Sequence, residues 1–139
     1  MSAFLDRPDY YTTINLTVLD TLVGGDSTII TELSLEAIEE MKSYLVSRYD
    51  VANIFSQIGM ARNKTVLMYA KDIALFHIYS LYNIRRIPAI REQRYKNALA
   101  WLVNVSEQKL SPVGLALTTN ADSALVKSGG NEKRINQQQ

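Results

Sequence analysis

Hydrophobic residues recur every three or four positions in three stretches of the chain, which is the spacing of an amphipathic helix. The first stretch predicts a helix over residues 34–49 with Ser34 as its N-cap, and its apolar face is formed by Leu35, Ile38, Met41, Tyr44, Leu45 and Tyr49. The second predicts a helix over residues 64–82 that Asn63 caps and that is apolar on almost every side. A helix of that kind is buried on most sides, either at the centre of its domain or at a subunit contact.

The third helix is predicted to begin near Pro88, because proline suits the first turn of a helix, and to continue to about residue 108. Residues 50–62 are read as a linker between the first two helices, whereas only residues 83–87 separate the second from the third. So short a connection makes these two helices antiparallel neighbours. The predicted fold class is mostly all-α: a small helical bundle built on an antiparallel αα-hairpin, with an extended C-terminal tail.

The residues before the first predicted helix give a weaker pattern. Asp6 followed by Pro8 predicts a short helix near the N-terminus. Residues 14–22 fit both a strand and a helix, so their structure stays open, and Gly24-Gly25 ends whatever precedes it. We expect three parts: an N-terminal segment packing on the core (1–33), a helical core (34–115) and an extended tail (116–139).

The composition of the chain narrows its chemistry. Its 139 residues include no cysteine and one histidine, and 47% are hydrophobic against 21% charged, as in an ordinary globular domain. The missing thiols exclude disulfides, thiolate zinc sites, iron–sulfur clusters and a cysteine nucleophile. His77, in the apolar second helix, is read as a packed core residue, and Glu36, Glu39 and Glu40 as a solvated face near a helix start. We therefore expect no catalytic residue, no metal and no cofactor, and the chain is not expected to be an enzyme.

The chain shows no sign of a membrane or export segment. It lacks a run of roughly 18 consecutive apolar residues, and its N-terminus lacks a basic region followed by an apolar run. We expect a soluble, unexported protein with no membrane partner.

The two halves of the chain carry opposite charge. Residues 1–50 contain 3 Lys or Arg against 9 Asp or Glu, whereas residues 51–139 contain 12 against 5. Such a split suits a subunit that meets its neighbour head to tail, with one sign of charge against the other. The alternative, that acidic residues merely favour one helix, stays open on charge alone.

Charged residues of the predicted hairpin point to two kinds of contact. Asp72 lies in the most apolar helix, and Arg91 and Arg94 on the facing helix are predicted to form a structural ion pair with it. The same part of the chain holds a basic cluster: Arg62, Lys64, Lys71, Arg85, Arg86, Arg91, Arg94 and Lys96. The cluster suits either nucleic acid or an acidic protein face, and no recognition motif decides between them.

A distributed pattern runs through three segments of the chain. They read AIEEMKSYLVSRYDV at residues 37–51, RNKTVLMYAKDIALFHIY at 62–79 and REQRYKNALAWLVNVSEQKLSP at 91–112. The features that carry the pattern are Tyr44-Leu45, Arg48-Tyr49, Asp72-Ile73-Ala74, Arg94-Tyr95, Ala98, Trp101-Leu102, Lys109 and Pro112. Over roughly residues 35–115 this pattern resembles the Mu-like bacteriophage neck protein family.

The resemblance implies a head-tail connector or head-completion protein of a tailed bacteriophage. Such a protein is made in the cytoplasm of the bacterial host and forms a homo-oligomeric ring in the neck of the virion, where a dodecamer would match the usual symmetry of the portal. The ring extends the DNA channel, so DNA passes through its lumen without sequence readout. One face of the ring binds the portal protein and the other binds the next neck or tail component. The family offers no active site to carry over.

The polar tail is expected to contact the portal, with strand addition as one mode of docking. The expected contact residues are Leu125, Val126, Lys127, Lys133, Arg134 and Ile135. Four basic residues, Arg62, Lys64, Arg85 and Arg86, are expected either to line the DNA lumen or to contact the neighbouring subunit. The alternative function is a small nucleic-acid-binding helical module that uses the basic cluster. A small enzyme ranks last, because the sequence offers few groups for a convergent polar pocket.

Overall fold

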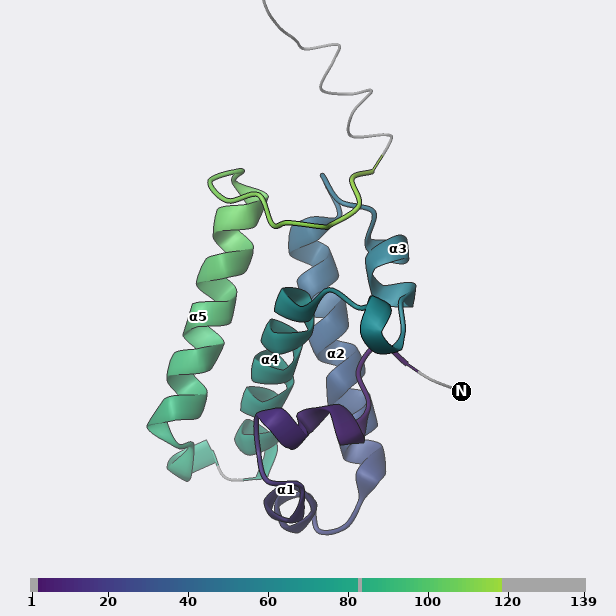
Figure 1. Cartoon of the computed structure of the whole chain (residues 1–139). Helices are drawn as coiled ribbons and strands as arrows, with labels where there is room; N and C mark the ends of the chain where they lie inside the picture. The colour runs from purple at the N-terminus through teal and green to yellow at the C-terminus, as the bar shows by residue number, and fades with distance from the viewer. Residues whose placement is uncertain (1–2, 83, 119–139) are drawn as a thin grey trace, which may run out of the picture.

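The computed structural model describes residues 3–82 and 84–118. Its elements are, in order, η1 (Arg7–Thr12), α1 (Leu16–Leu22), α2 (Ser27–Leu45), α3 (Val51–Ser56), η2 (Gly59–Ala61), α4 (Lys64–Tyr82), η3 (Ile84–Arg86) and α5 (Ala89–Ser106). The long helices α2, α4 and α5 form a bundle, and the short elements lie along its side and at its ends (Figure 1). The predicted all-α bundle is confirmed for the described residues. Most of the predicted tail lies outside them.

Helix α4 is the centre of the bundle. It packs against α2 on one side and α5 on another, and its buried residues lie around most of its circumference: Val66, Ala70, Lys71, Asp72, Ile73, Ala74, Leu75 and Ile78. The helix begins at Lys64 and ends at Tyr82, as predicted, and the side chain of Asn63 caps it by accepting the amide of Val66 at 3.0 Å. The predicted antiparallel hairpin with α5 is also confirmed (Figure 1).

Helix α2 begins earlier than the sequence pattern predicts. Gly24 and Gly25 both have positive φ, 65° and 80°, and turn the chain so that Asp26 caps the helix by accepting the amide of Thr28 at 3.1 Å. Ser34 is therefore a buried residue in the middle of α2, and the prediction that it caps the helix is wrong. The expected boundary between residues 33 and 34 accordingly falls inside α2.

The apolar face predicted for this helix also needs one correction. The face that meets α4 and α5 contains Ile30, Ala37, Met41 and Leu45, each no more than 1% exposed. Leu35 lies beyond the edge of this face and is 47% exposed. The buried face of α2 is longer than predicted, because it begins at Ile30, but it is also narrower and does not reach Leu35.

The N-terminal elements pack on the bundle. The short helix predicted near Asp6 is confirmed as the 3-10 helix η1. Asp6 is its N-cap, and the backbone amide of Asp6 donates to the carboxylate of Asp9 at 2.8 Å. The open segment at residues 14–22 is helical, because Asn15 caps α1 by accepting the amides of Thr17 and Val18. Tyr10, fully buried, holds η1 against α2.

The chain after α5 returns across one end of the bundle. Two backbone hydrogen bonds join it to the segment between α2 and α3: Asp50 donates to Ala116 at 2.8 Å, and Thr118 donates to Arg48 at 3.0 Å. The segment that the sequence pattern predicts as a linker, residues 50–62, contains the short helices α3 and η2. No helix within the described residues combines the length and the apolar character needed to cross a membrane.

Candidate functional site

Asp72 and Arg94 form the ion pair at the centre of the hairpin. The Nε atom of Arg94 lies 2.7 Å from Asp72 Oδ1, and the carboxyl side chain is only 4% exposed. Burial raises the pKa of Asp72, and the bond from Arg94 offsets only part of that effect. The structure does not bring Arg91 into this pair, because its Nη2 atom donates instead to the carbonyl of Thr13 at 3.1 Å.

Two more members of the basic cluster are tied into the fold. The Nζ atom of Lys71, a residue 7% exposed, donates to Thr12 Oγ1 at 2.6 Å and to the carbonyl of Asp9 at 3.2 Å. Arg62 contacts the Asp9 carboxylate at 2.9 Å and donates to the carbonyl of Phe4 at 2.8 Å. These contacts hold η1 and the preceding residues against α4.

The basic cluster is therefore not one continuous surface. Arg62, Lys71, Arg91 and Arg94 make contacts within the fold, whereas Lys64, Arg85, Arg86 and Lys96 are exposed. Lys64 begins α4, while Arg85 and Arg86 follow its end, so they lie at opposite ends of a helix of 19 residues. The basic residues are close in sequence, but the positive charge on the surface is less concentrated than the sequence predicts, because four of the eight side chains bond to groups within the fold.

Glu40 joins the three long helices and is not part of a solvated face. Its Oε1 atom lies 2.9 Å from Nε2 of His77 on α4, and its Oε2 atom accepts the hydroxyl of Tyr95 on α5 at 3.2 Å. The Tyr95 ring stacks on Phe76 with centroids 4.1 Å apart, and burial together with Glu40 raises the pKa of Tyr95 to about 12. His77, 29% exposed at its side chain, is thus an edge residue with a carboxylate partner and not the packed core residue that was predicted.

We expect Glu40→Ala to destabilise the fold by about 1–2 kcal/mol, because two hydrogen-bond donors on different helices lose their acceptor. The neighbouring variant Glu39→Ala is the matched control. Glu39, 70% exposed, pairs only with Lys42 one turn away, so its removal should change the free energy of unfolding by less than about 0.5 kcal/mol. Urea unfolding of both variants measures the difference, and equal losses would contradict the assignment.

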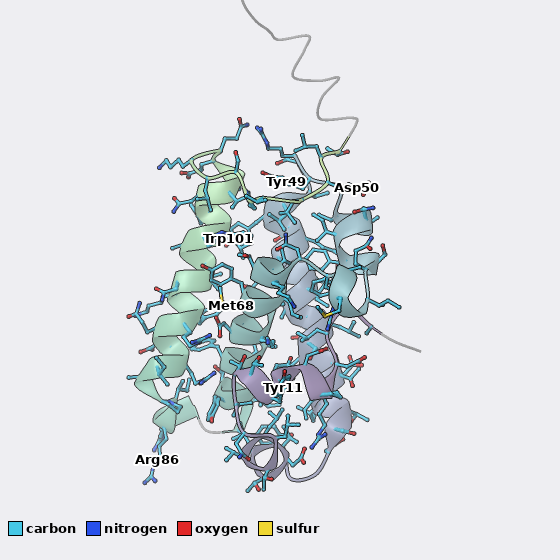
Figure 2. The ribbon with its side chains drawn as sticks, viewed as in Figure 1. Tyr11, Tyr49, Asp50, Met68, Arg86 and Trp101 are labelled. Carbon is cyan, nitrogen blue, oxygen red and sulfur yellow. The ribbon has the colours of Figure 1, made fainter. Side chains whose placement is uncertain are left out.

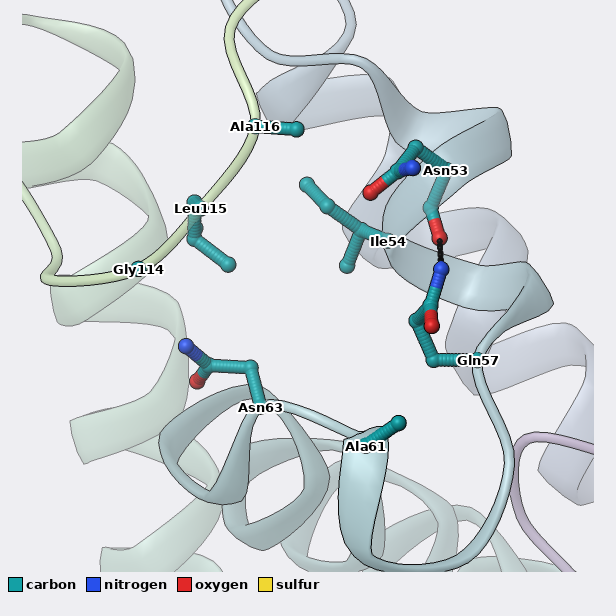
Figure 3. Close-up of a pocket in the computed structure, with 8 residues that line it drawn as sticks. All are labelled: Asn53, Ile54, Gln57, Ala61, Asn63, Gly114, Leu115 and Ala116. Carbon is teal, nitrogen blue, oxygen red and sulfur yellow. Dashed lines mark hydrogen bonds between the residues drawn. The ribbon is translucent and has the colours of Figure 1, made fainter.

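A polar hollow of about 300 Å³ lies near the end of the bundle where the chain returns. Figure 3 shows Asn53 and Gln57 on one side of it, Asn63 below and the segment 114–116 opposite. The amide of Gln57 donates to the Asn53 carbonyl at 2.9 Å, and the amide of Asn63 donates to the carbonyl of Val113 at 3.1 Å. The Asn63 amide thus fastens the returning chain, the Gln57 amide closes the end of α3, and we assign the hollow a structural role.

A second hollow lies on the side of α4 and differs in character. It measures about 320 Å³ and is lined by Asp9, Tyr11, Thr12, Met60, Arg62, Lys64, Leu67 and Lys71. Tyr11 and Met60 are 71% and 84% exposed. Neither residue belongs to a periodic helical pattern, so no signal in the sequence singled them out.

Exposed apolar side chains also gather at both ends of the bundle. At the end where α4 meets α5 they are Val18, Leu81, Tyr82 and Ile90, and at the other end they are Val46, Leu110, Val113 and Leu117. Figure 2 marks the first end by Arg86 and the second by Tyr49 and Asp50. The predicted tail contacts, Leu125, Val126, Lys127, Lys133, Arg134 and Ile135, lie outside the described residues. Within residues 3–82 and 84–118, no three His, Cys, Asp or Glu side chains are grouped to hold a metal ion.

Fold and surfaces together define a small all-helical domain whose buried charges join its own elements and many of whose exposed apolar side chains lie at its ends and beside α4. The chain matches the family described as Bacteriophage Mu, Gp36 over residues 3–129, and it belongs to that family. It is therefore a Mu-like phage protein of the structural and morphogenesis class. No curated protein and no solved structure matches the chain.

Proposed function

We propose that the chain is a head-tail connector, an adaptor in the neck of the virion that forms a ring between the portal and the tail and extends the DNA channel. Its mechanism is assembly without catalysis: each subunit binds its neighbours in the ring, the portal on one side and the next neck or tail component on the other. Membership of the Bacteriophage Mu, Gp36 family supports a role in the particle.

The observation that carries the proposal is the pair of apolar ends. Leu81, at 58%, and Ile90, at 56%, expose large side chains at one end of the bundle, and Val113, at 91%, does so at the other. Large apolar side chains that are exposed together on one part of a surface are typical of protein contact surfaces. A subunit with such surfaces at opposite ends suits a position between two different neighbours.

The exposed arginines fit the same arrangement. Arg85 and Arg86 project at one end of the bundle, as Figure 2 shows for Arg86. In a ring they place positive charge at a rim of the channel, where phosphates pass without sequence readout. This contact needs no base-specific side chain, and it accounts for basic residues that hold no internal partner among the described residues.

Removal of residues 119–139 tests the portal contact. We expect the truncated chain to keep its helical fold, because the bundle and the returning segment up to Thr118 are intact. We also expect it to lose attachment to the portal, since the apolar and basic residues of the tail are gone. Circular dichroism and co-sedimentation with the portal protein of the same phage measure the two effects. Unchanged portal binding would contradict the role of the tail.

The solution mass of the full chain separates the connector from the alternative nucleic-acid module. A connector should join the portal in a number of copies that matches the portal's symmetry, as measured by light scattering coupled to size exclusion. A nucleic-acid module should instead show strongly salt-dependent retention on duplex DNA and no association with the portal. The second result would replace the proposal.

A further inference from the structure

An open groove follows the first half of α4. We use the name α4 groove for two hollows together: one of about 320 Å³ is lined by Tyr11, Met60 and Leu67 among others, and one of about 190 Å³ is lined by Met68 among others. An exposed rim of large side chains around a hollow is typical of a surface that another molecule covers.

The groove contains two lysines, the exposed Lys64 and the 7% exposed Lys71, and neither forms an ion pair with a carboxylate of the described residues. Lys71 donates only to neutral oxygens, and no carboxylate of the described residues lies within 4.0 Å of its ammonium or that of Lys64. The nearby carboxylates of Asp9 and Asp72 are engaged by arginines. Burial lowers the pKa of Lys71, a cost that an anionic partner over the groove would reduce.

The outer face of α2 has the opposite charge and the same spacing. Glu32 and Glu39 are seven residues apart, as are Lys64 and Lys71, which places each pair about 10 Å apart along its helix. In both helices a leucine follows three residues after the first charge: Leu35, 47% exposed, in α2 and Leu67 in α4. The two surfaces therefore match in charge, in apolar position and in repeat.

We propose that the acidic outer face of α2 from a second copy of the chain docks in the α4 groove, with one of the two glutamates facing the exposed Lys64 and Leu35 covering Leu67 and Met68. Because α2 turns its opposite face to α4 within one molecule, the donor and acceptor surfaces lie on different sides of the subunit. The contact is then head to tail and repeats from copy to copy. Its closure into a ring rests on the proposed connector function.

Cysteine cross-linking of the full chain tests the contact, since the chain has no cysteine of its own. A variant with Leu35→Cys and Met68→Cys should give a ladder of covalent multimers with a short bismaleimide. The control carries Leu35→Cys and Val103→Cys. Val103 lies on α5, outside the proposed contact, and at 37% it is as exposed as Met68 at 38%, so the two cysteines should be equally accessible to the reagent. The reaction is run on the protein alone, up to about 1 mM, and on the protein mixed with phage heads.

The ladder itself identifies the geometry. A head-to-tail contact extends the ladder beyond the dimer, and the control should stop at background. Cross-linked dimers from Met68→Cys alone would indicate a symmetric contact and overturn the proposal. Equal ladders from both double variants, or no ladder in either sample, would overturn it as well.

Charge reversal gives a second, independent readout. Lys64→Glu should lower the yield of cross-linked product about tenfold, because attraction across the contact becomes repulsion. The exposed Lys96 provides the control, and Lys96→Glu should leave the yield unchanged. Lys64→Glu is then combined with Glu32→Lys in one variant and with Glu39→Lys in another. One of the two combinations should restore the yield, and which one does so gives the relative direction of the two helices. Restoration by neither would contradict the assigned pairing.

The outcomes also separate this contact from the connector function. A chain that attaches to the portal but gives no ladder keeps the connector proposal and loses the groove. A chain that gives the ladder but never attaches to the portal keeps the groove and loses the connector.

Discussion

Replacement of Arg94 by glutamine is expected to destabilise the fold by about 3 kcal/mol at neutral pH, because it removes the ion-pair partner of the buried Asp72 carboxylate and leaves only the more distant charges of Arg91 and Lys71. Asp72 is 4% exposed at its side chain, whereas Arg94 is 37% exposed and can turn to water. The converse change, Asp72→Asn, should therefore cost about 1 kcal/mol or less, since it removes the charge that burial disfavours. Urea unfolding of both variants measures the asymmetry, and equal losses would count against it.

The same pair predicts a pH dependence. The pKa of Asp72 is raised in the folded protein, and loss of Arg94 raises it further. A raised carboxyl pKa gives stability that is present below the unfolded-state pKa of about 3.9 and is lost as the pH rises through the folded-state pKa. The deficit of Arg94→Gln should thus narrow from about pH 7 toward about pH 4. A deficit that stays constant over this range would show that Asp72 is not the cause.

Truncation of Tyr10 to alanine is expected to destabilise the protein by about 3–5 kcal/mol. The side chain is fully buried, and its hydroxyl lies 2.5 Å from Ser34 Oγ. Because Ser34 donates its own hydrogen to the carbonyl of Ile30 at 2.6 Å, Tyr10 is the donor to Ser34. The matched control is the next residue: Tyr11, 71% exposed, should tolerate alanine within about 0.5 kcal/mol.

The milder variant Tyr10→Phe keeps the ring and should cost about 1–2 kcal/mol. It also tests the titration of the phenol, because burial raises the pKa of Tyr10 in the folded state. Because the neutral phenol is favoured in the folded state, it contributes stability below about pH 10, and this contribution is lost as the pH rises further. Phenylalanine cannot ionise, so Tyr10→Phe should lose less stability at alkaline pH than the unchanged protein. Unfolding curves on both sides of that pH provide the measurement, and unaltered alkaline behaviour would contradict it.

The sequence predicts the helices with a strong apolar repeat and the glycine turn. Helix α4 and its Asn63 cap follow directly from local pattern, because a cap and the turn that it satisfies are close in sequence. The start of α2 was missed since Thr28, Thr31 and Glu32 dilute the repeat around the buried Ile30. Serine is a common N-cap residue, which is why the pattern predicts a cap at Ser34. In the structure Ser34 lies inside α2, where its hydroxyl bonds to the hydroxyl of Tyr10.

Contacts distant in sequence were the least predictable. Glu40 carries the charge and spacing of a solvated helix face, yet it joins His77 and Tyr95, 37 and 55 residues away. An ion pair at Asp72 could be predicted because one short connection brings its two helices together. The sequence could not show that Arg94 and not Arg91 is the partner, because Arg91 is drawn away by a hydrogen bond to the carbonyl of Thr13. The groove residues Tyr11 and Met60 come from short irregular elements that carry no periodic signal.

The returning segment has a mechanical consequence. Because Ala116 and Thr118 are bonded to the backbone at Asp50 and Arg48, tension on the chain beyond Thr118 is transmitted first to the segment between α2 and α3 and not to the end of α5. The load path then enters the most deeply buried part of the bundle, through Leu45 and Met41, instead of peeling the last turn of α5. A pull on the chain beyond Thr118 would thus be resisted by the helices of the bundle and not by the last turn of α5 alone.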